Sequence, residues 1–238
     1  MTEGNPNNDN RGSIFQLKIH LENISPLIWR RIKVSGDTTI AELHYIIQLV
    51  MGWADDHLHY FKVNGREYGV EHHGGLQFLD DPMKVCIADL KLKRNRKFSY
   101  TYNFTGRWEH EIRVEDILPP DNSFTRPLCL DGSRACPPEI VYGPRIYPIF
   151  LDALSSFQME MIRTYEKILW GKDKKLGRLE QEFVDRGDHL WEHRFFNPER
   201  FDKKETDGFL EELYQKKGHT LNDLHLAFHE LLYDIEWY

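Results

Sequence analysis

The sequence predicts an α+β protein in which one helix packs across a mostly antiparallel sheet, in a β-grasp-like arrangement, followed by a helical C-terminal extension. Three observations support this prediction. Residues 14–21 alternate apolar and polar side chains, as a half-buried strand does. Residues 39–52 carry an apolar stripe at helical spacing. Short strand-like runs follow as far as residue 117, and helical patterns dominate after residue 148.

The first strand, helix and hairpin each have a local signal. Phe15, Leu17 and Ile19 share one face of the first strand, and a second strand is expected after the bend at Pro26. Thr39 and Glu42 form the pattern of a capping box at the start of the helix, and Gly52 supplies a left-handed stop. The pair Asn64-Gly65 predicts a tight hairpin turn, because both positions tolerate positive φ.

The remaining chain divides into further strands, a connection and helices. Residues 119–148 are rich in proline and predict a long irregular connection, a kind of segment that is often functional. Strand-like runs are expected over 84–90, 97–104 and 108–117, and helices over 149–171, 176–193 and 218–237.

Composition and charge limit the classes of function. Hydrophobic residues make up 40% and charged residues 29% of the 238, as in an ordinary globular protein. The net charge of −7 argues against indiscriminate nucleic-acid binding. Residues 1–150 hold 18 Lys and Arg against 19 Asp and Glu, so most of the negative charge belongs to the C-terminal part.

The compartment is predicted to be the cytoplasm. The segment 1–12 has no apolar core and reads as a disordered tail, not a secretory signal. No apolar run is long enough to span a bilayer, so no membrane contact is expected. Three cysteines are too few for a disulfide scaffold.

Histidines and carboxylates offer a possible metal or acid–base site. Imidazole and carboxylate groups are common ligands of zinc and iron, but the strict spacings of known metal motifs are absent. The sequence therefore favours polar residues with local hydrogen bonds. The residues on offer are Asp55, Asp56, His57, His59, Glu71, His72, His73, His110 and Glu139, of which the weak catalytic candidates are His57, His59, His110 and Glu139.

Two further features have alternative interpretations. Cys129 and Cys136, seven residues apart, are either buried packing residues or a redox-sensitive pair, and packing is favoured. Five of the seven residues 91–97 are basic and precede alternating aromatics, a pattern that can track phosphates and stack bases. The alternative is a solvated turn, which the overall acidity favours. The candidate nucleic-acid contacts are Lys93, Arg94, Arg96 and Lys97.

Five motifs, taken in order, resemble the plasmid pRiA4b ORF-3-like family. They are "SPLIWRRIKV", "TIAELHYIIQLVMGWADDHLHYF", "YTYNFTGRWEHEI", "CLDGSRACPPE" and "FFNPERFD". The resemblance covers about residues 13–155 and 188–202. It implies a compact α+β domain with a β-grasp-like core and no securely assigned activity. Some members accompany insertion elements under a resolvase-like label, which nothing in this chain supports.

Several family positions differ in this chain. Asn103, Gly106 and Asn197 stand where the family pattern has carboxylates, Thr105 replaces a glycine, and residues 140–143 replace an Asp-Cys-Gly-Gly run. A metal or acid–base site built on those positions would lack ligands, so no metal and no cofactor are predicted. The residues that match the pattern are Trp108, Glu109, His110, Cys129, Asp131, Cys136 and Glu139.

The resemblance places the family domain at residues 13–155, followed by a helical extension at 156–238. Within this extension, residues 157–187 are an insertion relative to the family. The insertion has an amphipathic helical pattern, which suits either a partner surface or a cover for a sheet edge. We predict a non-enzymatic interaction or regulatory protein of a prokaryote or mobile element, with a protein partner or a second copy bound by the extension. The alternatives are a metal-dependent enzyme of hydrolase or nuclease type and a nucleic-acid-binding accessory. The binding candidates are Arg107, Trp108, Tyr165 and Trp170, and Trp108 and His110 are expected at the exposed end of the hairpin.

Overall fold

The computed structural model describes residues 10–70, 77–170 and 190–233. Four predictions lie wholly or mostly outside these ranges. They are the disordered tail at 1–12, the possible ligands Glu71, His72 and His73, the insertion beyond residue 170, and the helix expected over 176–193.

A seven-stranded antiparallel sheet forms the body of the described chain, in the order β4-β3-β5-β6-β1-β2-β7. Its central strands β1 and β6 pair through a register shift between Gln16 and Leu17. The strands are β1 (Ile14–Leu21), β2 (Trp29–Ser35), β3 (His59–Val63), β4 (Arg66–Tyr68), β5 (Lys97–Tyr102), β6 (Trp108–Leu118) and β7 (Leu128–Ser133).

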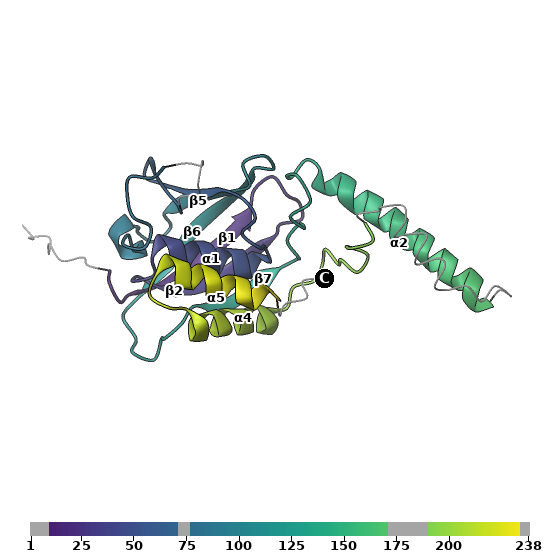
Figure 1. The fold of residues 1–238 in the computed structure, drawn as a ribbon. Coiled ribbons are helices and arrows are strands. Elements are labelled where there is room, and N and C mark those ends of the chain that lie inside the picture. The colour runs from purple at the N-terminus through teal and green to yellow at the C-terminus, as the bar shows by residue number, and fades with distance from the viewer. Residues whose placement is uncertain (1–9, 71–76, 171–189, 234–238) are drawn as a thin grey trace, which may run out of the picture.

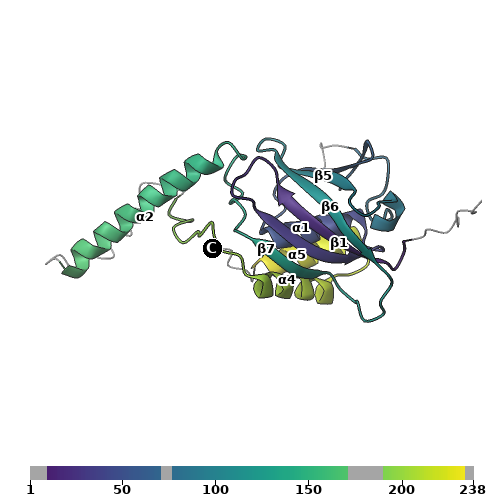
Figure 2. The same ribbon diagram turned by 180° about the vertical axis from the view of Figure 1, so that it is seen from behind.

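Of the four α-helices in the described residues, three cover one face of this sheet. Figure 1 shows α1 and α5 in front of the sheet and α4 beside β7, and Figure 2 shows the opposite face without a helix over it. The remaining helix, α2, projects away from the body. The helices are α1 (Ile40–Met51), α2 (Tyr147–Trp170), α4 (Lys203–Lys216) and α5 (Leu221–Tyr233), with a short 3-10 helix, η1 (Ile87–Leu90).

The core lies between the sheet and α1. Leu17, Ile19 and Ile32 point inward from β1 and β2 and are fully buried, while Lys18 and Arg31 alternate with them on the open face. Fully burying one such aliphatic side chain stabilises the fold by about 1.5–3 kcal/mol. The architecture is α+β, and the more specific β-grasp-like arrangement stays a prediction.

The local signals at the start of the chain are confirmed. Thr39 accepts a hydrogen bond from the Glu42 backbone N–H while the Glu42 carboxylate accepts one from the Thr39 N–H. Gly52 has a φ of 89° and ends α1 in the left-handed conformation. Asn64 and Gly65 have φ values of 50° and 84° and connect β3 to β4.

Two predictions about elements are wrong, and one helix was not predicted. Residues 84–90 form no strand but end in η1, because the Asp89 carboxylate accepts from the Cys86 N–H and turns the chain. The irregular connection contains β7, which extends the sheet beside β2. Helix α4 falls in a stretch that carried no helix prediction, although Asp202 caps its first turn through the Lys204 and Glu205 N–H groups.

Helix α2 joins the family-like domain to the extension without a break. The boundary drawn at residue 155 falls inside this 24-residue helix. Its first turns pack in the main core through Tyr147 and Leu154, while Phe157 and Met161 belong to a separate small cluster. No helix among the described residues is both long and apolar enough to cross a membrane.

Candidate functional site

A closed ring of hydrogen bonds joins α1, the loop after it and β5. The His44 Nε2–H donates to Asp55 Oδ1 at 2.8 Å, so Nδ1 accepts from the Tyr100 hydroxyl at 2.9 Å. Gln48 closes the ring, because its amide donates to the Tyr100 oxygen and its carbonyl accepts the Asp55 backbone N–H. All four side chains are 1% exposed or less, so the ring fixes both the tautomer of His44 and the direction of the Asp55 carboxylate.

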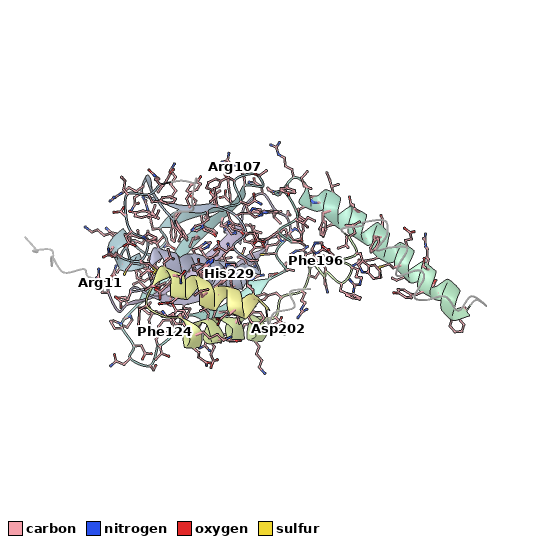
Figure 3. All side chains as sticks on the ribbon, viewed as in Figure 1. Arg11, Arg107, Phe124, Phe196, Asp202 and His229 are labelled. Atoms are coloured by element: carbon pink, nitrogen blue, oxygen red, sulfur yellow. The ribbon has the colours of Figure 1, made fainter. Side chains whose placement is uncertain are left out.

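Helix α5 brings two more histidines to the open side of this ring. Asp55 Oδ2 lies 3.9 Å from His225 Nδ1, and the Tyr45 hydroxyl lies 3.1 Å from the same nitrogen. The His225 and His229 rings are 4.2 Å apart, one helical turn from each other. Figure 3 labels His229 on α5, where the helix lies over α1.

The surroundings of these groups shift their pKa values in different directions. Burial, with smaller effects from His229 and His44, lowers the pKa of His225, and Asp55 opposes this effect. Burial beside Asp55 raises the pKa of Tyr45. At neutral pH His225 is therefore uncharged, and Tyr45 keeps its proton.

Two sets of ligand atoms in the described residues are close enough to share a metal ion. One is His44, Asp55 and His59, and the other is Asp55, His225 and His229; within each set the atoms lie within 4.8 Å of one another. Asp55 and His59 were expected from the sequence as possible ligands, whereas His44, His225 and His229 were not. The sequence offers no signal for His44, which faces the core from a helix. For His225 and His229, the signal of a shared site is their four-residue spacing.

The predicted catalytic candidates are distributed around this region. The His59 ring stacks on His44 at 3.5 Å, and its Nε2 accepts from the Val70 N–H. Glu139 accepts hydrogen bonds from the Tyr102 hydroxyl and the Ala54 N–H, and burial raises the pKa of its carboxyl. The His57 ring lies edge-on to Tyr102. Neither metal-ligand set includes His57, His110 or Glu139.

Trp108 and His110 were expected at an exposed hairpin end, and this prediction is wrong. They are 1% and 0% exposed, because both side chains point into the core and contact Trp53. The His110 Nδ1–H donates to the Trp108 and Tyr100 carbonyls, and burial lowers the pKa of this histidine to about 3. Arg107 alone is exposed, and it pairs with Glu109 at 2.9 Å.

A close backbone contact explains one departure from the family pattern. A Cβ atom at Gly143 would lie 2.2 Å from the Gly106 carbonyl oxygen, and Gly143 has a φ of 93°. A Cβ at Gly106 would in turn meet the Gly143 nitrogen at 3.1 Å. The loop after Glu139 therefore lies directly on the turn before β6, and this arrangement leaves little room for a carboxylate at position 106.

The basic run at 91–97 forms the turn between η1 and β5. Arg94 lies 3.7 Å from Asp116, Lys97 lies 2.7 Å from Glu111, and the Arg96 guanidinium donates to Asn64. Arg94 and Lys93 also line a shallow surface hollow. Acidic neighbours offset two of these charges, which is the pattern of a solvated turn.

Cys129 and Cys136 are buried free thiols, the arrangement that the packing interpretation predicts. The Cys136 sulfur lies 3.7 Å from the Met51 sulfur and 4.0 Å from the Arg30 guanidinium. Burial raises the pKa of each thiol to about 11. Neither thiol is present as the reactive thiolate at neutral pH.

The two aromatic candidates on α2 lie on different faces of the helix. Tyr165 packs against Phe157 and Met161. Trp170 is 89% exposed and lies two to three turns beyond the exposed Met159 and Ile162. These three side chains form what we call the outer face of α2, opposite the small cluster.

Comparisons with known proteins agree with the resemblance found in the sequence. The chain is 30% identical over 144 residues to the uncharacterized protein y4hQ of Sinorhizobium fredii. The aligned residues make up 60% of this chain and 74% of that protein. It is also similar to the crystal structure of MM3350, a protein of unknown function from Methanosarcina mazei Go1. The TM-score is 0.58 at 31% identity, over 81% of this chain and 97% of the other.

The family model matches from the first strand into α4. The model for the plasmid pRiA4b ORF-3-like protein covers residues 13–205, which leaves α5 outside the match. This match includes most of the chain, so the protein belongs to the plasmid pRiA4b ORF-3-like family.

Proposed function

We propose that this chain is a non-enzymatic interaction protein and that two copies associate through the outer face of α2. One observation carries the proposal. Met159, Ile162 and Trp170 expose 48%, 52% and 89% of their surface along one face of a helix that projects away from the body (Figure 1). Large apolar side chains gathered on one face are typical of association surfaces. The prokaryotic or mobile-element setting stays a prediction.

The shape and charge of α2 favour a second copy as the partner. Because the helix extends from the body, two such helices can lie side by side without bringing the two sheets into contact. Glu160 and Arg163 are both exposed at the edge of the outer face. In an antiparallel pair with two-fold symmetry, Glu160 of each copy exchanges the contact it makes within its own chain for Arg163 of the other copy, so one surface forms two identical ion pairs.

Charge reversal on α2 tests this arrangement. Glu160→Arg and Arg163→Glu, made singly, each place like charges opposite one another and should weaken self-association about tenfold. The double variant restores both pairs and should recover the wild-type dissociation constant. Sedimentation equilibrium over a range of concentrations measures the effect.

Apolar substitutions provide a second arm of the same experiment. Ile162→Ser with Trp170→Ser should reduce association further, because large apolar side chains dominate such interfaces. Leu226→Ser, at a 51% exposed leucine on α5, is the matched control and should have no effect. A wild-type protein that stays monomeric at every concentration, or a dimer indifferent to these changes, would contradict the proposal.

A further inference from the structure

The histidine–aspartate set on the open side of the hydrogen-bonded ring has the composition of a metal site. Asp55, His225 and His229 provide one carboxylate and two imidazoles, the ligands that zinc and related divalent ions prefer. They come from two separate elements, the loop after α1 and helix α5. We propose that these three residues bind one divalent transition-metal ion of the zinc class between that loop and α5.

The distances suit this ion after small side-chain rotations. Ligand atoms at zinc distances of about 2.0–2.1 Å lie roughly 3.3 Å apart in a tetrahedral site. The three ligand atoms here are already within 4.8 Å of one another, and Asp55 Oδ2 is 3.9 Å from His225 Nδ1. His225 and His229 are one turn apart on α5, which places both rings on the same side of the helix.

The ring beneath the site positions the carboxylate. His44 donates to Asp55 Oδ1, and Tyr100 in turn donates to His44. One Asp55 oxygen is therefore held in the interior while the other faces His225. A metal-bound carboxylate that is itself hydrogen-bonded is the usual arrangement of an outer ligand shell. Three protein ligands leave the fourth position for water or an outside group.

This site differs from the family site whose ligands are missing from the sequence. The prediction of no metal rested on Asn103, Gly106 and Asn197, none of which belongs to the present set. Two of the three ligands lie on α5, outside the residues that the family model matches. The proposal is also independent of α2, since no ligand comes from that helix.

Zinc titration of the metal-free protein tests the proposal. The purified chain is treated with a chelator, dialysed and titrated with Zn²⁺ alone in a calorimeter. We expect one Zn²⁺ per chain, with a dissociation constant in the micromolar range or tighter. His225→Gln and His229→Gln should each weaken binding at least about tenfold. His219→Gln, at an exposed histidine just before α5, is the matched control and should bind as the wild type does.

A second measurement separates loss of a ligand from loss of the fold. Bound zinc should raise the unfolding temperature of the wild type and of His219→Gln, because only the folded chain assembles the three ligands. The increase should vanish in His225→Gln and His229→Gln, whose metal-free circular dichroism should match the wild type. Wild-type protein that binds no zinc, or that binds it equally well after either substitution, would overturn the proposal.

Discussion

At the scale of single residues, burial decides what each titratable group can do. His110 and His44 are both fully buried, but His44 exchanges hydrogen bonds with Asp55 and Tyr100. The hydrogen-bond partners of His110 are two backbone carbonyls, which require only its Nδ1–H. Its Nε2 has no hydrogen-bond partner in the described structure. A charged His110 would therefore place a second N–H in an apolar interior, and this accounts for its pKa of about 3.

His110 should make the protein less stable in acid. Its pKa is lower in the folded chain than in the unfolded chain, so the unfolded chain binds the extra proton between pH 6.5 and about 3. The free energy of unfolding should fall by about 1.4 kcal/mol per pH unit as the pH decreases through that window. His110→Gln removes this contribution, and urea unfolding at a series of pH values measures the change in slope.

The control for this measurement is His219→Gln, which removes one exposed histidine. The Gln variant at position 110 is expected to be less stable at neutral pH, because it changes the packing against Trp53. The prediction concerns the slope alone. Equal slopes for wild type and His110→Gln below pH 6.5 would refute it.

At the scale of elements, some predictions succeeded because their signal was local, although the equally local cap at Asp202 was overlooked. The capping box at Thr39 and the turn at Asn64-Gly65 depend on neighbouring residues, and both formed as expected. Strand β7 could not be predicted this way, because it is a strand only through its pairing with β2, about 100 residues earlier. The metal-ligand set was missed for the same reason: Asp55 and His225 are 170 positions apart in the sequence.

Loss of the α1 cap should destabilise the whole fold. Thr39→Ala removes the hydrogen bond to the Glu42 N–H, and such changes cost about 0.5–2 kcal/mol. Glu42 also pairs with Lys217 at the end of α4, so a disturbed first turn affects two helices. Urea unfolding should show a lower midpoint with an unchanged m-value. Thr105→Ala, at an exposed loop threonine, should cost far less, and equal losses would argue against the cap as the cause.

At the scale of the whole molecule, packing divides the described chain into a body and a projecting helix. One large core includes the sheet, α1, α4 and α5, together with the first turns of α2. Among the described side chains of α2 beyond residue 156, Phe157 and Met161 are buried, and they form a separate cluster with a few partly buried neighbours. Stability is therefore unevenly distributed, since each part opens at a cost that depends on the apolar surface it buries.

Hydrogen exchange of backbone amides should show this division. Amides of β1 and β6, at the centre of the sheet and over the main core, should exchange slowest, because only global unfolding exposes them. Amides of residues 158–170 should exchange much faster in dilute protein, since opening that part of α2 disrupts only the small cluster.

If two copies pair through α2, protection of residues 158–170 should rise with protein concentration while that of β1 stays constant. Glu160→Arg should shift the rise to about tenfold higher protein concentration, and the double variant with Arg163→Glu should restore the wild-type curve. Exchange in residues 158–170 as slow as in β1 at every concentration would mean that this helix is part of the body, and would remove the basis for an association surface there.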